Sequence, residues 1–307
     1  MITKAPTLEK AKQELRERNI PLIEVDKFGY VALIGFYGSD EHICEVARLT
    51  SNSKSKDNES LIRYLMRNRH SSPFEFCDIE LEIAPPIFVE RQWIRHRTGK
   101  TNEISARYSE LPGEVFELPL ERLVHSPTGN SSRQGSGLPF DKEEHSWFLE
   151  RYNFCVQNAV NTYSEFCTKD LAPEVARMHL PLSTYTRKRW KCDLHNLLHF
   201  LGLRIDGHAQ KEIQNYANAV ATFTKQLFPI SYQAFEDYRM NAVTFSKQEQ
   251  QILRRHLNVN GAWAVDYLMD SVNDERFIQV LKEDLNIKLG KTELQEFKSK
   301  LKKVFEK

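Results

Sequence analysis

Apolar and polar residues alternate along the first third of the chain in patterns that predict short helices and strands. Residues 7–19 carry apolar side chains at helical spacing behind a capping threonine, which is typical of an amphipathic helix. The apolar runs 22–25 and 30–36 flank a glycine turn and predict a β-hairpin. Residues 76–83 alternate almost strictly between apolar and acidic side chains, so this segment is expected to be a strand with one buried face.

The remainder of the chain carries mainly helical patterns. Residues 141–169 repeat large apolar side chains along one side of a long helix, and Asp193 precedes a further helix that runs to Arg204. Between them, residues 181–191 contain β-branched and aromatic side chains that favour a strand. The apolar spacing after residue 240 predicts three or four more short helices. This mixture of strands and helices does not by itself select one fold.

Charge composition limits the partners that this chain is expected to bind. The 43 Lys and Arg residues balance 42 Asp and Glu residues, for a net charge of +1. Binding to nucleic acid or to a membrane surface usually needs a large excess of basic groups, so small molecules are the expected partners. The sequence has neither a signal-peptide pattern nor an apolar stretch of about eighteen residues, so we expect a cytoplasmic protein without a membrane span. Its five widely spaced cysteines are expected to be buried, reduced thiols.

The candidate chemistry is densest in residues 90–108, which contain four arginines, one lysine and one histidine. Arginine presents a planar fork of donors that matches phosphate oxygens, so this stretch is suited to a phosphorylated small molecule. The apolar side chains of Trp93 and Ile94 are expected to anchor it to the core. On composition alone, a solvated basic face with weak surface ion pairs is an equal alternative.

A second polar group lies in residues 193–208. Asn196 and His199 are three residues apart and share one face of the predicted helix. Three histidines occur here, but no cysteine or carboxylate completes a metal-binding set at the usual spacing, so no metal site is expected. Considered alone, Arg177 and Arg204 are typical partners of surface ion pairs.

Three motifs together resemble the flavin-dependent thymidylate synthases, the ThyX family. The first is Arg95-His96-Arg97 followed, after seven residues, by Ser105. The second is H-x-S-P-F-E beginning at His70, and the third is D-L-H-N beginning at Asp193. The resemblance extends over about residues 31–240 and therefore covers most of the chain.

The chain departs from the family pattern at two positions. Lys100 stands where the family usually has serine, and Phe76 stands where it commonly has histidine. Because the resemblance ends near residue 240, we expect a flavin-dependent thymidylate synthase domain over residues 1–240 and a helical C-terminal extension over residues 241–307. A packing appendage is preferred for this extension over a tail that binds a partner.

The resemblance implies both the fold and the reaction. The fold is α+β, a mixed domain with a curved, largely antiparallel sheet flanked by helices, and the family assembles as a homotetramer. The reaction makes dTMP from dUMP, with methylenetetrahydrofolate as the one-carbon donor and NADPH-reduced FAD as the hydride source. The alternative is a non-catalytic flavin-binding or nucleotide-binding relative of the same fold.

The resemblance also implies the residues of the site. Arg204 is expected to be catalytic, as a fixed cation that stabilises charge developing on the uracil ring. The residues expected around FAD are Ser72, Arg95, His96, Arg97, Glu103, Asp193, Leu194, His195 and His199. The residues expected around dUMP are Gln92, Arg95, Glu103, Ile104, Ser105, Ala106, Arg107, Arg177 and Arg204. Residues 133–136 are similar to the family's Q-G-S loop, which is either a lid over the substrate or a plain linker.

Overall fold

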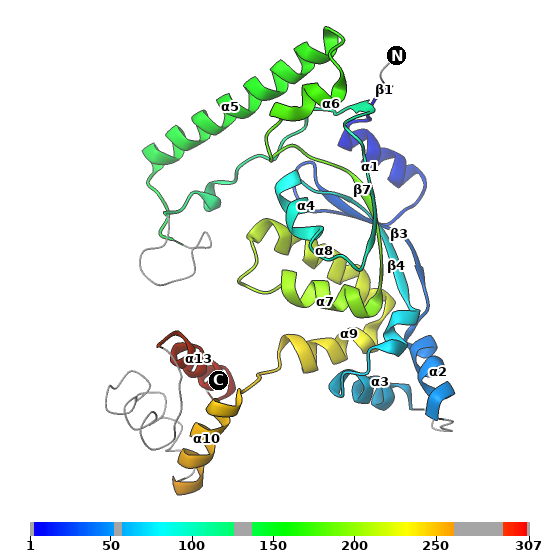
Figure 1. Ribbon diagram of the computed structural model, residues 1–307, viewed down its shortest axis with the longest axis vertical. Coiled ribbons are helices and arrows are strands. Elements are labelled where there is room, and N and C mark those ends of the chain that lie inside the picture. The colour runs from blue at the N-terminus through cyan, green and yellow to red at the C-terminus, as the bar shows by residue number, and fades with distance from the viewer. Residues whose placement is uncertain (1–2, 52–56, 126–136, 261–290, 306–307) are drawn as a thin grey trace. The chain divides into compact units, whose positions relative to one another are not determined.

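The computed structural model describes residues 3–51, 57–125, 137–260 and 291–305. The chain divides into two compact units, Met1–Met240 and Asn241–Lys307. The larger unit is built on a five-stranded sheet that is covered by helices (Figure 1). The loop expected at residues 133–136, and any helix expected within residues 261–290, lie outside the described residues.

The central sheet is antiparallel throughout, with the strand order β2-β3-β4-β7-β5. Its strands are β2 (Leu22–Glu24), β3 (Tyr30–Tyr37), β4 (Asp78–Ala84), β7 (Lys188–Asp193) and β5 (Lys100–Glu103). A separate parallel pair joins β1 (Thr3–Lys4) to β6 (Ser109–Glu110). The predicted hairpin is confirmed, because Leu22 pairs with Ala32 across its turn. The predicted α+β class with a largely antiparallel sheet is confirmed as well.

The strand predicted in residues 181–191 begins later than expected. Thr184 and Tyr185 form only isolated bridges, and regular pairing with β4 starts at Lys188. The reason lies in the partner strand, because β4 ends before Pro85 and Pro86. Proline has no backbone N–H to donate, so pairing beside these residues is reduced to the isolated bridge between Pro86 and Tyr185. Local strand propensity was therefore overridden by the neighbouring segment.

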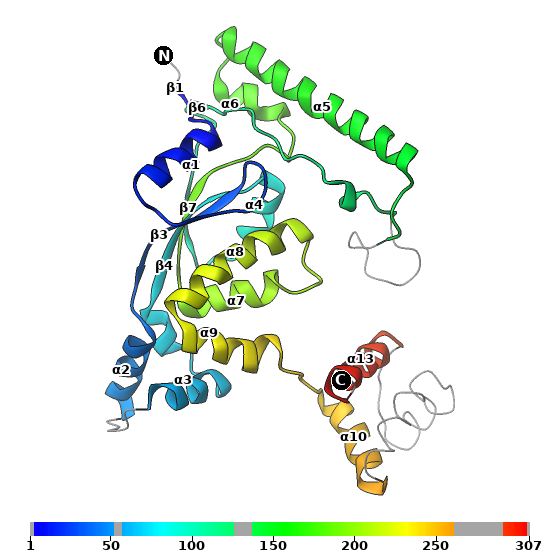
Figure 2. The same cartoon turned by 180° about the vertical axis from the view of Figure 1, so that it is seen from behind.

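One face of the sheet carries the main core. The apolar side chains predicted to alternate along β4 are buried there, namely Cys77, Ile79, Leu81 and Ile83. They belong to one core cluster with α7 (Leu194–Arg204) and α8 (Lys211–Leu227), which lie together on this face in Figures 1 and 2. The carboxylate of Asp193 accepts a hydrogen bond from the backbone N–H of Asn196 at 2.9 Å, which caps α7 as predicted.

The other face of the sheet is covered by α1 (Leu8–Glu17). The hydroxyl of Thr7 caps this helix by accepting a hydrogen bond from the backbone N–H of Lys10 at 3.3 Å. Its apolar side packs against Tyr30 and Ala32 of β3. The hydroxyl of Tyr30 donates a hydrogen bond to the carboxylate of Glu82 at 2.8 Å. This buried carboxylate of β4 therefore has a hydrogen-bond partner.

Three more helices close one end of the sheet: α2 (Asp40–Ser51), α3 (Asn58–Arg67) and α9 (Pro229–Phe235). The carboxylate of Asp40 accepts hydrogen bonds from the backbone N–H groups of Ile230 at 2.8 Å and Ser231 at 3.1 Å, so it ties α2 to the start of α9. A short 3₁₀ helix, η1 (Ser72–Phe76), connects α3 to β4.

The long helix α5 (Lys142–Thr168) extends over 27 residues and begins with a capping box made by Asp141 and Glu144. Its predicted apolar side is only partly buried, with Trp147 59% and Phe166 37% accessible to solvent, and neighbouring Phe154 is 65% accessible. Burial on this helix is limited to Val156 and Tyr163. Cys155 is exposed too, so the prediction of buried cysteines is wrong at this position.

The smaller unit contains α10 (Lys247–Asn260) and α13 (Lys291–Phe305). The Lys300 ammonium lies 2.7 Å from the Glu249 carboxylate, and the ring centroids of Phe245 and Phe297 are 6.2 Å apart. These two helices agree with the apolar pattern of the sequence. Within the described ranges of both units, no helix is long and apolar enough to cross a bilayer.

Candidate active site

The basic stretch is fixed to the core by Trp93, the last residue of α4 (Ile87–Trp93). Its ring is fully buried, and its centroid lies 5.4 Å from that of Trp190 and 4.4 Å from that of Phe200. Aromatic pairs of this kind contribute about 0.5–1.5 kcal/mol beyond the area that they bury. Ile94 is 48% exposed, so the predicted anchoring is confirmed for Trp93 and wrong for Ile94.

Gly99 allows the turn after α4 to lie directly against Trp190. A β-carbon on Gly99 would stand 2.1 Å from Nε1 of Trp190, which is far inside a normal contact. The turn then enters β5, where Glu103 pairs with Lys188 of β7. Lys100 is exposed on this edge strand, and its side chain points to the face opposite that of Glu103. Lys100, where the chain departs from the family pattern, therefore faces away from Glu103, the predicted site residue of β5.

Arg204, at the end of α7, is hydrogen-bonded to the same turn. Its Nε donates to Nε2 of His96 at 2.9 Å, and its Nη2 donates to the carbonyl oxygen of Gln92 at 3.2 Å. Burial, followed by the positive charge of Arg204, lowers the pKa of His96 to about 4. The imidazole is therefore neutral at pH 7, and its Nε2 keeps the lone pair that accepts the hydrogen bond.

A buried ion pair beneath the turn was not anticipated from the sequence. Lys188 of β7 and Glu90 of α4 are in direct contact, and their side chains are 1% and 6% exposed. Burial raises the pKa of Glu90 and lowers the pKa of Lys188, and the attraction between the two groups opposes both shifts. The ammonium of Lys188 also lies 4.7 Å from the ring centroid of Trp93. A cavity of about 220 Å³ opens beside the pair and is lined in part by His96 and Arg97.

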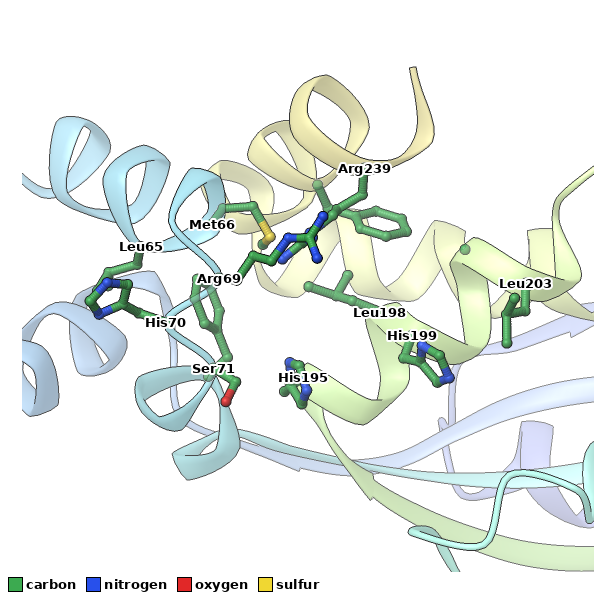
Figure 3. A pocket seen from close by; sticks show the side chains of 13 residues that line it. Leu65, Met66, Arg69, His70, Ser71, His195, Leu198, His199, Leu203 and Arg239 are labelled. Atoms are coloured by element: carbon green, nitrogen blue, oxygen red, sulfur yellow. The ribbon is translucent and has the colours of Figure 1, made fainter. Parts of the chain in front are cut away.

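A larger cavity, of about 470 Å³, is lined by residues of α3, η1, α7 and α9 (Figure 3). One wall is apolar, with Leu65, Leu198 and Phe235 among its side chains. The polar side chains that line it are Arg69, His70, Ser71, His195, His199 and Arg239. A volume of this size, with an apolar wall and a few polar groups, is typical of a site for a small molecule or cofactor.

Two of the residues predicted around FAD, His195 and His199, line this cavity. Ser72 does not line it but is the exposed neighbour of Ser71. The ring centroids of His199 and His96 are 6.1 Å apart, so the cavity lies next to the Arg204 hydrogen bonds. Phe76 is 56% exposed at the end of η1.

Several of the residues predicted around dUMP form a separate, largely exposed group. Nε of Arg107 donates to the carboxylate of Glu174 at 3.0 Å, and its backbone N–H donates to the hydroxyl of Ser105 at 3.3 Å. Ala106 between them is buried, and Arg177, three residues after Glu174, is exposed. The arginine donors of this group therefore face solvent, while Ala106 at the centre of the turn is buried.

The remaining predicted residues are placed by β7 and α7. The carboxylate of Glu103 accepts a hydrogen bond from the hydroxyl of Thr186 at 2.5 Å, and the backbone N–H of Ile104 donates to the carbonyl oxygen of Arg187 at 2.9 Å. Leu194 is buried in the core, while Arg95 and Arg97 are exposed.

On one chain the predicted residues thus do not share one pocket, and three groups of them can be distinguished. These are the Arg204 hydrogen bonds, the cavity of Figure 3 and the Arg107 turn. Among the described residues, no group of three or more His, Cys, Asp or Glu side chains is arranged to hold a metal ion.

The fold and the site define an α+β protein with an arginine-rich turn beside an apolar cavity, a combination suited to phosphorylated aromatic ligands. A family model described as "Thymidylate synthase complementing protein" matches residues 32–230. The flavin-dependent thymidylate synthase of Ruegeria pomeroyi is 44% identical over 236 residues, which cover 75% of this chain and 78% of that protein. The flavin-dependent thymidylate synthase of Dictyostelium discoideum is 39% identical over 233 residues, which cover 75% of this chain and 76% of that protein.

A solved structure is also similar. It is the UMP/dUMP methylase PolB of Streptomyces cacaoi bound with 5-Br UMP, which matches at a TM-score of 0.64 and 30% identity over 72% of this chain and 99% of that one. The chain belongs to the thymidylate synthase complementing protein family, and its curated relatives carry the name flavin-dependent thymidylate synthase. The family resemblance of its three motifs is therefore confirmed.

Proposed function

We propose that this chain makes dTMP from dUMP, with methylenetetrahydrofolate as the one-carbon donor and NADPH as the reductant of a bound FAD. The expected enzyme class and its flavin dependence are confirmed by the names of its relatives. The observation that carries the proposal is the hydrogen-bonded unit of Arg204, His96 and Gln92 next to the cavity. The methylase neighbour bound with 5-Br UMP supports a uracil nucleotide as the substrate.

The described residues fit a flavin. The apolar wall of the cavity in Figure 3 matches a planar ring system, and its guanidinium and imidazole groups match ring oxygens and phosphates. Bound FAD, once reduced, supplies the hydride that completes the methyl group. We assign to its surroundings Ser72, Arg95, His96, Arg97, Glu103, Asp193, Leu194, His195 and His199. Because the side chain of Leu194 is buried, its part in this proposal is to position His195.

Arg204 is assigned the catalytic role. When the uracil ring forms a bond to the one-carbon unit, negative charge moves toward a ring carbonyl, and a fixed cation beside it lowers the energy of that state. Neutral His96 accepts from Nε of Arg204 and so fixes the plane of the guanidinium. The residues assigned to dUMP are Gln92, Arg95, Glu103, Ile104, Ser105, Ala106, Arg107, Arg177 and Arg204.

Arg107→Gln is expected to raise the KM for dUMP about 10- to 100-fold, because a hydrogen bond to a charged phosphate contributes about 1.5–3 kcal/mol. The measurement compares kcat/KM for dUMP and for deoxyuridine, which lacks the phosphate. The variant should lose most of the preference for dUMP over deoxyuridine. Equal losses for both substrates would show that Arg107 does not contact the phosphate.

Assembly into a homotetramer is part of the proposal. It is supported by the division of the predicted site residues on one chain into groups that share no pocket, and by the exposed aromatic side chains of α5. Trp147 and Phe154 are seven residues apart and so share one face of that helix. Exposed apolar side chains grouped in this way are typical of contacts between subunits.

The assembly is tested by the mass of the protein in solution. We expect four times the mass of one chain, and a lower mass after Trp147→Asp and Phe154→Asp, which place charges on the proposed contact. Phe36→Asp changes an exposed phenylalanine of the sheet and serves as the control. A monomer that makes dTMP would contradict the proposed assembly.

The reaction is assigned to residues 1–240, with residues 241–307 as a helical extension. The proposed location is the cytoplasm, and the free cysteines, including exposed Cys155, fit a reducing compartment.

The direct test incubates the protein with dUMP, methylenetetrahydrofolate, FAD and NADPH, and follows dTMP by chromatography. Omission of dUMP, methylenetetrahydrofolate or NADPH should stop its formation, and so should removal of FAD from the protein. A protein that binds FAD and dUMP but forms no dTMP would instead be the non-catalytic relative.

A further inference from the structure

The cavity of Figure 3 is positively charged without a compensating acid. Arg69 and Arg239 both line it, together with three histidines, and the described residues that line it include no Asp or Glu. Apolar side chains such as Phe74 and Phe235 form much of the remaining wall. The cavity therefore combines a surface suited to an aromatic ring with a charge suited to an anion.

Arg69 is directed into the cavity by the way in which α3 ends. The backbone N–H of Arg69 donates to the carbonyl oxygen of Met66 at 3.3 Å, and that of His70 donates to Leu65 at 3.0 Å. This pair of hydrogen bonds is the Schellman arrangement, which places the residue after the cap in the left-handed conformation. Arg69 has a φ of 61°, a conformation that glycine adopts more easily. Arginine adopts this conformation less easily than glycine, but at this position its side chain reaches the cavity.

Arg239 comes from the other side, in η4 (Glu236–Met240). The two acids of this segment have other basic neighbours, since Asp237 lies 2.7 Å from Arg63 and Glu236 lies 4.0 Å from Lys225. Among the described residues, neither Arg69 nor Arg239 has an ion pair. Burial, followed by the positive charge of Arg69, lowers the pKa of Arg239, so the two guanidinium groups are close enough to repel each other. An anion between them would remove that repulsion.

We propose that Arg69 and Arg239 form an anion-binding subsite for the charged end of an aromatic cofactor that lies in this cavity. This inference rests on the proposed function and deepens it. Two groups in that reaction carry suitable oxygens, the pyrophosphate of FAD and the glutamate carboxylates of the folate. Both match the arginine fork, so they share the chemistry that the subsite recognises.

Arg69→Gly is the most informative variant, because glycine suits the backbone at this position while the charge is removed. Its melting temperature is expected to equal or exceed that of the unmodified protein. Arg239→Gln removes the second charge. Arg18→Gln, at the exposed end of α1, is the control for the loss of one charge elsewhere.

The measurements are the dissociation constants of FAD and riboflavin, followed by flavin fluorescence, and the KM of methylenetetrahydrofolate with one glutamate and with several. Loss of a hydrogen bond to a charged group predicts a weakening of about tenfold or more for one anionic ligand. Weaker binding of FAD with unchanged binding of riboflavin assigns the subsite to the pyrophosphate. A rise in KM that grows with the number of glutamates, with unchanged FAD binding, assigns it to the folate.

Unchanged constants for all four ligands in both variants would overturn the proposal. Equal losses for FAD and riboflavin, and for both folates, would overturn it as well, because the arginines would then only shape the cavity. If the unmodified protein formed no dTMP while Arg69→Gly still weakened FAD binding selectively, the proposed function would fail and the subsite would stand.

Discussion

Replacing Arg204 by lysine is expected to lower kcat for dTMP formation about 10²–10³-fold, the typical cost of removing a donor to charge that develops in a transition state. Lysine keeps the positive charge but not the planar fork. It cannot donate to His96 and to the carbonyl oxygen of Gln92 in the geometry that Arg204 adopts at 2.9 and 3.2 Å. The remaining charge would therefore no longer be held beside the uracil ring.

The change is measured by steady-state turnover of the purified variant, with its flavin content and melting temperature determined in parallel. Arg18→Lys changes an exposed arginine directly after α1; it is the matched control and should retain the rate of the unmodified protein. A rate for Arg204→Lys within threefold of the unmodified protein would contradict the assigned role of Arg204.

Gly99→Ala is expected to lower the free energy of unfolding by about 1–3 kcal/mol and to abolish tight binding of FAD. The added methyl group would stand 2.1 Å from Nε1 of Trp190. Trp190 is 2% exposed and packs against Trp93 and Phe200, each with its ring centroid at 5.4 Å, so it cannot swing aside. The turn that carries Arg95, His96 and Arg97 must move instead.

Gly35→Ala is the matched control, because nothing lies within 4 Å of the β-carbon that it adds. Denaturant unfolding and titration with FAD should show almost no change for this control. If Gly99→Ala kept the stability of the unmodified protein but bound FAD more weakly, the turn would still contribute to FAD binding. Its packing against Trp190 would then not contribute to stability. Wild-type values for both properties would show that the position of the turn does not depend on Trp190.

Local patterns in the sequence predicted the parts of the fold whose causes are local. The Thr7 cap and the alternation along β4 were read correctly, because each depends on neighbouring residues. The prediction of a helix from Asp193 to Arg204 was correct for the same reason. The prediction of a strand at Thr184–Thr186 was wrong. The pairing of this segment is limited by the prolines that follow β4, which lie about a hundred positions earlier in the chain.

Pairs of residues that are distant in the sequence were not predictable in the same way. Lys188 is in phase with the buried Trp190 and Cys192 along β7, and this alternation was the one available sign that its charge is buried. Its partner Glu90 could not be inferred, because nothing in the sequence states that α4 lies over β7. The side chains of Arg69 and Arg239 likewise meet in one cavity only after α3 and α9 have packed.

The visible spectrum of the purified protein under anaerobic conditions is the most direct test of the proposed reaction. We expect a flavin spectrum that bleaches when NADPH is added and recovers only when dUMP and methylenetetrahydrofolate are both present. The recovery should be accompanied by one dTMP for each flavin reoxidised. A flavin that stays reduced with both substrates present, or a protein that cannot be loaded with FAD, would contradict the proposed reaction.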